Sequence, residues 1–328
     1  MKLLVTGGCG FIGSNFILRC FEKEKNIKII NIDALKFGSN KQNLASIKNE
    51  NYSFVKGDIN NKKIMEKLID KVDCIINFAA ESHVDRSIEN SEPFIKSNIL
   101  GVHTILEILK SKKNIKFLQI STDEVYGEIL KGSFIENGRL NPSNPYSATK
   151  ASAEMLVRSY ARTYDLNTII TRSVNNYGSR QFPEKLIPKT IISILKGKQI
   201  PLHGKGLAKR QWIHVQDNCD AILKIIHCWK NDSIYNIPGN FESNNRSLVK
   251  SILKFMNASE KLIKYVPDRP GQDMRYGIRS NILKRDIGFI PNIDFEIGIR
   301  STIEWYKENQ KWWERLSFDK VSNPTPWK

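Results

Sequence analysis

Two hydrophobic patterns alternate along the first half of the chain. Short runs rich in β-branched residues are followed by longer stretches in which apolar residues recur every three or four positions. The short runs predict strands and the longer stretches predict amphipathic helices. The predicted strands are Lys2–Thr6, Lys28–Ile32, Ser53–Val55, Cys74–Phe78, Phe117–Ile120 and Thr168–Thr171. The predicted helices are Ile12–Lys23, Asn61–Asp70, Pro93–Lys110 and Tyr146–Tyr164.

This alternation predicts an α/β fold with a doubly wound parallel sheet. After Arg172 the pattern loosens, and Gly/Pro punctuation predicts a smaller substrate-binding lobe. We expect residues 1–174, plus about 207–238, to form the cofactor-binding domain, and about 175–206 and 239–328 to form the lobe. No linker is visible, so the chain is expected to cross between the two several times.

Composition narrows the class of protein. No run of about 18 apolar residues occurs, and the opening residues turn glycine-rich too early for a signal peptide, so we expect a cytoplasmic protein without a membrane partner. The five cysteines are an odd number without a CxxC pair, which predicts reduced, mostly buried thiols and no metal site. They are Cys9, Cys20, Cys74, Cys219 and Cys228.

The net charge of +17 opens the possibility of a nucleic-acid partner. However, the lysines are spread along the whole chain, without a basic tail, an arginine block or basic-aromatic alternation. We therefore interpret the charge as a generally basic surface and expect no nucleic acid.

A glycine turn follows the first predicted strand and precedes a predicted helix. It reads Gly7-Gly8-Cys9-Gly10-Phe11-Ile12-Gly13, and a second strand ends about 20 residues later at Asp33. In this context glycines let a pyrophosphate approach the backbone, and the carboxylate can bind a ribose 2′-hydroxyl and repel a 2′-phosphate. The spacing favours NAD over NADP.

Tyr146 and Lys150 stand four residues apart at the start of a predicted helix, so both side chains point from one face. We expect Asn144 to cap this helix and Pro145 to be its first residue. A free tyrosine has a pKa of about 10, and an ammonium within about 4–6 Å is expected to lower the pKa of Tyr146 toward neutral. Tyr52 and Lys56 share the spacing, but a predicted strand separates them by about 13 Å.

The strand Phe117–Ile120 delivers Thr122, Asp123 and Glu124 to the carboxyl end of the sheet, where α/β enzymes bind ligands. Consecutive strand residues point to opposite faces, so the two carboxylates can act on one substrate only if the backbone leaves the extended form there.

Over nearly its whole length the chain resembles the nucleotide-sugar 4,6-dehydratases of the extended short-chain dehydrogenase/reductase family, above all the dTDP-glucose type. The glycine and Tyr/Lys motifs are shared with epimerases, whereas Asp123-Glu124 after Thr122 is typical of dehydratases. Further matching motifs are Thr6–Gly13, Ala79–Ser87, Asn175–Gly178, Phe182–Pro188, Arg210–Trp212, Arg269–Asp273 and Arg275–Tyr276.

The resemblance implies a catalytic role for each of five residues. Tyr146, with Lys150, deprotonates the sugar O4 while hydride leaves C4 for NAD⁺, and Thr122 hydrogen-bonds that oxygen. Glu124 then removes the C5 proton and Asp123 protonates the departing C6 hydroxyl, after which hydride returns to C6. Loss of water from a ketosugar needs one carboxylate as base and one as acid.

The resemblance also implies two sets of binding residues and a homodimer paired through the Pro93–Lys110 and Tyr146–Tyr164 helices. Besides Tyr146 and Lys150, NAD is expected to contact Gly7, Gly10, Phe11, Ile12, Gly13, Asp33, Asp58, Ile59, Ala79, Ala80 and Ser82. The nucleoside-diphosphate-glucose is expected to contact Ser82, Thr122, Asn175, Lys185, Leu186, Arg210, Asn245, Arg269 and Tyr276. Gln272, Val174 and Ala34 depart from the usual family residues, which leaves open both the choice of thymine or uracil and the contacts with the adenosine.

Two other functions compete with this interpretation. A nucleotide-sugar 4-epimerase needs only the tyrosine, the lysine and a rotating ketosugar, so Asp123 and Glu124 argue against it. A non-catalytic, NAD-sensing or RNA-binding protein of the same fold has no need for the acid/base positions that this chain retains.

Overall fold

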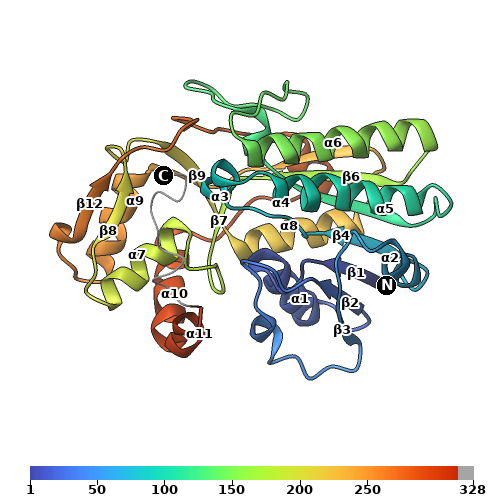
Figure 1. Ribbon diagram of the computed structural model, residues 1–328, viewed down its shortest axis with the longest axis horizontal. Coiled ribbons are helices and arrows are strands. Elements are labelled where there is room, and N and C mark those ends of the chain that lie inside the picture. Colours follow the sequence, from blue (N-terminus) through green and yellow to red (C-terminus); the bar gives the residue numbers. More distant parts are fainter. Residues whose placement is uncertain (317–328) are drawn as a thin grey trace.

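The protein is described by a computed structural model, in which residues 1–316 are described. Its centre is a seven-stranded parallel sheet in the order β10-β6-β5-β4-β1-β2-β3 (Figure 1). The strands are β1 (Lys2–Thr6), β2 (Lys28–Asp33), β3 (Tyr52–Lys56), β4 (Cys74–Asn77), β5 (Lys116–Thr122), β6 (Thr168–Ser173) and β10 (Ser233–Ile237).

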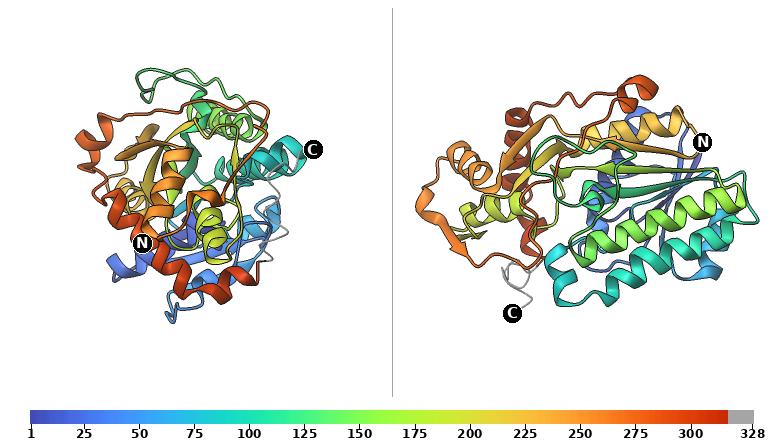
Figure 2. Two further views of the ribbon diagram at one scale, coloured as in Figure 1. Left: turned by 90° about the vertical axis from the view of Figure 1, so that its left-hand side faces the viewer. Right: turned by 90° about the horizontal axis from the view of Figure 1, so that it is seen from above.

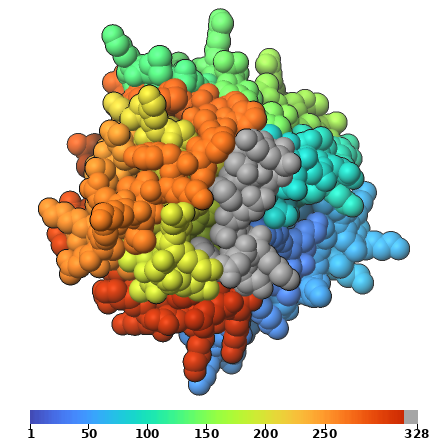
Figure 3. All heavy atoms as spheres, turned by 60° about the vertical axis from the view of Figure 1, so that its left-hand side comes forward, coloured from blue at the N-terminus to red at the C-terminus, as the bar shows by residue number. Residues whose placement is uncertain are grey.

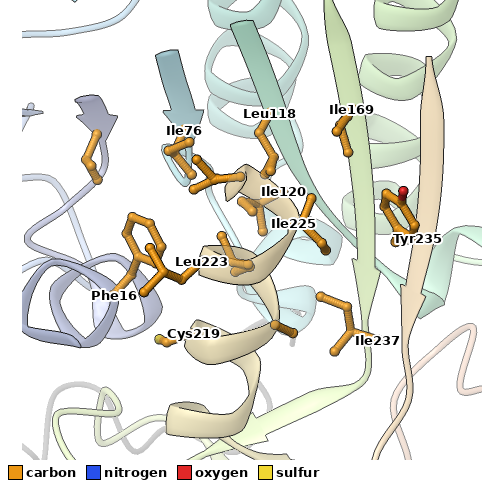
Figure 4. Close-up of a cluster of buried hydrophobic side chains, with 14 of the residues drawn as sticks. Phe16, Ile76, Leu118, Ile120, Ile169, Cys219, Leu223, Ile225, Tyr235 and Ile237 are labelled. Carbon is orange, nitrogen blue, oxygen red and sulfur yellow. The ribbon is translucent and has the colours of Figure 1, made fainter. Parts of the chain in front are cut away.

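Helices cover both faces of this sheet and bury its apolar side chains in two cores. The helices α1 (Phe11–Lys23) and α8 (Val215–His227) pack together on one face. Figure 4 shows side chains of α8 and α1 meeting the strand residues Ile76, Leu118, Ile169 and Tyr235. The other face is covered by α2 (Lys62–Ile69), α5 (Gly101–Leu109) and α6 (Pro145–Tyr164). The arrangement is a doubly wound Rossmann-type fold, as predicted.

The predicted elements of the first half are all present, with ends displaced by a few residues at most. The predicted helix Pro93–Lys110 is continuous helix as far as Leu109, formed by α4 (Glu92–Phe94), the π-helical η2 (Ile95–Leu100) and α5. Tyr52 and Lys56 lie on strand β3, so they do not form a second Tyr/Lys pair on a helix. Four of the five cysteines are buried, Cys228 is exposed, and all are free, as predicted.

The rest of the described chain forms two smaller sheets with their own helices. A three-stranded sheet contains β11 (Phe241–Asn244), β9 (Lys209–His214) and β7 (Asn175–Tyr177), and a two-stranded one contains β12 (Ile263–Val266) and β8 (Ile200–His203). The helices are α7 (Leu186–Leu195), α9 (Asn245–Phe255), α10 (Phe295–Glu308) and α11 (Gln310–Glu314). Figure 3 shows these later segments, in yellow, orange and red, gathered on one side of the molecule. Five short helices, α3 (Val84–Glu89), η1 (Lys41–Leu44), η3 (Asp123–Tyr126), η4 (Glu260–Leu262) and η5 (Leu283–Ile287), complete the described elements.

The division into two lobes stays a prediction. Strand β10 joins the large sheet, whereas β9, which the predicted boundaries place with it, pairs with β7 and β11. The last twelve residues of the predicted lobe, 317–328, lie outside the described residues. Among residues 1–316, none of the helices is long and apolar enough to cross a membrane.

Candidate active site

A cavity of about 440 Å³ lies at the carboxyl ends of the large sheet's strands, the size of a small-molecule site. The strand order changes direction between β1 and β4. At such a switch point the loops that follow the two strands run to opposite sides of the sheet and leave room for a ligand. The cavity is lined by the glycine turn, by residues after β4 and β5, by α6, and by segments of the smaller sheets.

The glycine turn connects β1 to α1 in the geometry that a dinucleotide needs. Gly7 has a φ of 67°, and a Cβ there would lie 2.7 Å from the backbone of Ala79, so only glycine fits. Gly10 caps α1 without a side-chain hydrogen bond, which leaves the amino end of the helix open to an anion. The turn therefore fits a pyrophosphate between β1 and β4.

Asp33 ends β2 at the cavity, and its carboxylate is already oriented by the backbone. One oxygen accepts from the N–H of Cys9 at 2.9 Å and the other from the N–H of Leu35 at 2.7 Å. Burial raises the pKa of Asp33, and these two hydrogen bonds oppose that rise. Each oxygen keeps a lone pair for a ribose hydroxyl.

The strand β5 ends at Thr122, and the turn η3 begins at Asp123, so the backbone leaves the extended form where we predicted. The Thr122 hydroxyl donates to Asp123 at 3.2 Å and accepts the N–H of Glu124 at 3.3 Å. Glu124 lines the cavity, whereas Asp123 is buried and does not line it. Burial, and then the charge of Glu124, raise the pKa of Asp123 to about 7.

The helix α6 begins as predicted, with Pro145 first and Asn144 forming a capping box with Ser147. The backbone N–H of Tyr146 donates to the Ser87 hydroxyl at 3.1 Å. Both Tyr146 and Lys150 are buried and line the cavity. The cap thus places the phenol in the first turn, beside η3.

The prediction that Lys150 lowers the pKa of Tyr146 is wrong for the protein without bound cofactor. Burial raises the pKa of Tyr146, and Glu124 and Asp123 raise it further, while a hydrogen bond with Thr122 lowers it. The Lys150 ammonium instead donates to the carbonyl of Ile120 at 2.6 Å. Burial lowers the pKa of Lys150 to about 8, and Glu154 opposes that effect. The spacing of the two residues predicted their shared face but not the desolvation of the phenol.

The structure brings nearly all the predicted binding residues to this one cavity. From the cofactor set these are Gly7, Gly10, Phe11, Ile12, Gly13, Asp33, Asp58, Ile59, Ala79, Ala80, Ser82, Tyr146 and Lys150. From the substrate set they are Ser82, Thr122, Asn175, Lys185, Leu186, Arg210, Asn245 and Arg269. The Lys185 ammonium donates to the carbonyl of Ser82 at 2.8 Å, and Arg269 pairs with Asp85 at 3.0 Å.

Tyr276 is the predicted substrate residue that does not line the cavity. Its hydroxyl donates to Asp273 and lies 3.5 Å from a carboxylate oxygen of Glu124. The guanidinium of Arg210 stacks on its ring, 4.3 Å from the centroid. Tyr276 therefore supports Glu124 and Arg210 from outside the cavity.

Several lining residues were missed by the sequence prediction. His83 lies 3.2 Å from Glu184, and Phe37 and Phe182 pack against its ring. Lys189 is buried at the cavity one helical turn after Lys185, and burial lowers its pKa. That i,i+4 spacing was a usable signal, and His83 and Glu184 lie within motifs that already pointed to the site.

The comparisons with known proteins agree with this geometry. A model of the family described as GDP-mannose 4,6 dehydratase matches residues 4–302. The low-salt glycan biosynthesis protein Agl12 of Haloferax volcanii is 44% identical over 93% of this chain and 98% of its own. A dTDP-glucose 4,6-dehydratase of Streptomyces niveus is 38% identical over 99% of this chain and 98% of its own.

Solved structures divide into near and more distant relatives. The dTDP-glucose 4,6-dehydratase DesIV of Streptomyces venezuelae, with NAD and TYD bound, superimposes with a TM-score of 0.94 at 39% identity, covering 96% of this chain and all of that one. A UDP-glucuronic acid 4-epimerase of Bacillus cereus reaches 0.89 at 25% identity, covering 94% and 99%. With its glycine turn, its Tyr/Lys pair and a family model that spans most of its length, this chain belongs to the GDP-mannose 4,6 dehydratase family of nucleotide-sugar dehydratases.

Proposed function

We propose that this protein removes water from a nucleoside-diphosphate-glucose, dTDP-glucose or UDP-glucose or both, and forms the 4-keto-6-deoxy sugar with NAD as cofactor. The observation that carries the proposal is the meeting of Tyr146, Lys150, Thr122 and Glu124 in the cavity that also contains the glycine turn. Dehydratases are also the nearer relatives, whereas the solved epimerases are more distant.

The proposed chemistry assigns one proton transfer to each acid or base. When bound, NAD⁺ would supply the hydride acceptor for C4, and its reduced form would supply the same hydride for C6. Tyr146 takes the O4 proton, with Thr122 as its hydrogen-bonding neighbour. Glu124 takes the C5 proton, since its carboxylate lines the cavity. Asp123 supplies the proton for the C6 hydroxyl, since its raised pKa keeps it partly protonated near neutral pH. Asp123 does not line the cavity itself, but it shares a hydrogen bond with the Thr122 hydroxyl, which does.

The path of hydrogen tests this proposal. Deuterium placed on C4 of the substrate should reappear on C6 of the product, because one hydride leaves and returns within a single complex. In heavy water the C5 position should gain deuterium, because a proton on the Glu124 carboxylate can exchange with solvent. An epimerase would return the label to C4 and leave C5 unexchanged, and a binding protein would move no label. The proposal is contradicted if NMR of the product shows that the deuterium stays on C4 or is lost to solvent.

Mass spectrometry would settle the choice of base. Incubating the protein separately with dTDP-glucose and UDP-glucose should give a product lighter by one water from at least one of them. Comparison of the two rates then identifies the preferred nucleotide.

We further propose a homodimer, paired through η2, α5 and α6. The helices α5 and α6 lie side by side on one outer face (Figure 2). Three large apolar side chains on these elements are exposed: Ile95 by 44%, Leu100 by 50% and Met155 by 53%. Exposed apolar side chains on adjacent helices are typical of subunit interfaces.

Light scattering at micromolar protein is expected to give twice the chain mass of 37.7 kDa. Met155→Glu should shift the mass toward that of the monomer, because it places a charge within the paired face. The matched control is Ile297→Glu on α10, which is 68% exposed and lies outside those helices. A monomer mass for the unmodified protein would contradict the dimer.

A further inference from the structure

The short helix η1 holds a buried asparagine whose hydrogen bonds go to distant segments. Asn43 is only 4% exposed. Its side-chain N–H donates to the carbonyl of Cys9 at 2.9 Å, and its side-chain oxygen accepts from the indole N–H of Trp312 at 2.8 Å. Both ends of one amide are thus used, one toward the glycine turn and one toward α11. A buried amide with both ends bonded has one strongly preferred orientation.

Cys9, which accepts the hydrogen bond from Asn43, is itself bonded to a residue that lines the cavity. The Cys9 carbonyl also accepts from the N–H of Asn40, and the Cys9 N–H donates to the Asp33 carboxylate at 2.9 Å. Cys9 is the middle of the glycine turn, between Gly7 and Gly10, which both line the cavity. Asn43 therefore helps to fix the position of the glycine turn and, through Cys9, that of the Asp33 carboxylate.

The bond to Trp312 comes from the far end of the described chain, 269 residues away. Trp312 is 9% exposed, and its ring packs edge-on against those of Trp305 and Tyr306. Tyr306 also donates to the carbonyl of Gln181, which ties this aromatic cluster to the segment after β7. The indole N–H is consequently aimed at Asn43 by the packing of α10 and α11.

A second set of hydrogen bonds links the segment after β7 to α1 and η1. The backbone carbonyl of Ser179 accepts from the Asn15 side chain at 3.0 Å, and Asn15 lies on α1 just after the glycine turn. Arg180, next to Ser179, donates to the Asn43 carbonyl at 3.3 Å. The segment after β7 and the C-terminal helix α11 thus both reach the surroundings of the glycine turn, through Asn15 and Asn43.

We propose that Asn43 and Trp312 are positioning residues for NAD, through which the C-terminal helix α11 holds the glycine turn and Asp33 in the conformation that receives the dinucleotide. The inference rests on the proposed function only in taking NAD as the cofactor. Neither residue lines the cavity, so both act through Cys9.

Trp312→Phe tests this directly, because it removes the indole donor and keeps a ring in the cluster. In protein freed of cofactor, the dissociation constant of NAD measured by calorimetry should rise about tenfold, the equivalent of one hydrogen bond of about 1.4 kcal/mol. At saturating NAD the turnover number should return to that of the unmodified protein, since no group touching the sugar has changed.

The neighbouring tryptophan provides a matched control. The Trp313 indole donates to the carbonyl of Tyr306 at 2.9 Å, within the C-terminal helices themselves. Trp313→Phe makes the same chemical change in the same helix and should lower the melting temperature without weakening NAD binding more than about twofold. A role in stability alone predicts that the two variants behave alike.

Asn43→Ala provides a second route, because it breaks the same connection and leaves Trp312 in place. Weaker NAD binding in Trp312→Phe or Asn43→Ala, but not in Trp313→Phe, supports the proposal. Equal affinities in all folded variants overturn it, as does a failure of both test variants to fold, which would assign these residues to stability alone. If the unmodified protein itself does not bind NAD, the proposed function fails instead.

Discussion

Glu124→Gln is expected to slow water loss by about 10²–10⁴-fold while leaving oxidation at C4 intact, because the amide cannot take the C5 proton. The change is nearly isosteric, and the contacts of Glu124 with Asn144 and Tyr276 are both 3.5 Å long, so the fold should persist. Mixing the variant with substrate should therefore produce the absorbance of bound NADH without release of the dehydrated sugar.

The control is Glu128→Gln, four residues along the same segment. Glu128 is exposed, and its carboxylate accepts the N–H of Met274 at 2.6 Å outside the cavity. It should dehydrate the sugar at the unmodified rate. If Glu124→Gln turned over at the wild-type rate, Glu124 would not be the base for the C5 proton. The proposal would then lose the residue that distinguishes a dehydratase from an epimerase.

Asp123→Asn is the companion variant, and the pH dependence distinguishes its role. Since Asp123 acts as an acid and its pKa is raised to about 7, turnover should fall as pH rises through about 7 and the carboxyl loses its proton. The variant should be slow at every pH and should lack that limb. A profile unchanged by Asp123→Asn would assign the limb to another group.

The raised pKa of Asp123 also affects how stability depends on pH. An ion-paired carboxylate, whose pKa is lowered, stabilises the fold more as pH rises, whereas Asp123 does the reverse. The folded pKa lies above the ordinary value of 3.8, so the native state binds the proton more tightly than the unfolded state. The contribution of this group to the free energy of unfolding is therefore greatest at low pH and falls as pH rises from about 4 to about 7. Asp123→Asn should flatten this part of the stability curve, measured by denaturant unfolding at several pH values.

Tyr146→Phe is expected to stop the reaction at its first step, with a loss of at least about 10²–10⁴-fold. Without the phenol no group takes the O4 proton, so C4 is not oxidised and no NADH absorbance should appear. This outcome differs from that of Glu124→Gln, where NADH appears and stays. NAD affinity, measured by calorimetry, should change little, because Phe keeps the ring packed near Phe94.

Tyr164→Phe, at the other end of α6, is the control for the loss of a hydroxyl from this helix. It should leave turnover unchanged. Formation of NADH by Tyr146→Phe at the rate of the unmodified protein would show that another residue is the base.

The raised pKa of Tyr146 also bears on when this base becomes active. Burial and the two carboxylates keep the phenol protonated in the protein alone. A positive charge on a ligand beside the phenol would act against both effects. Binding of the oxidised, cationic nicotinamide is thus expected to lower the pKa of Tyr146, which an ultraviolet titration with and without NAD⁺ would detect.

Much of this molecule followed from local sequence signals. The alternating periods predicted the strands and helices of the large sheet, because an element's own side chains report its geometry. The cap at Asn144 and the glycine turn were equally readable, since each depends on a few adjacent residues. The requirement that the chain bend after Thr122 also came from sequence, because the period of a strand sets which residues share a face.

What the sequence left undetermined was the surroundings of each group after folding. Adjacency in sequence could not tell that Glu124 would line the cavity while Asp123 would be buried, or that Tyr276 would support Glu124 rather than line the site. The pKa direction of Tyr146 followed from burial, which arises only when η3 and α6 pack together. The bond between Trp312 and Asn43 joins segments 269 residues apart. Desolvation and long-range contacts such as these depend on which elements the tertiary fold brings together, and no local period encodes that.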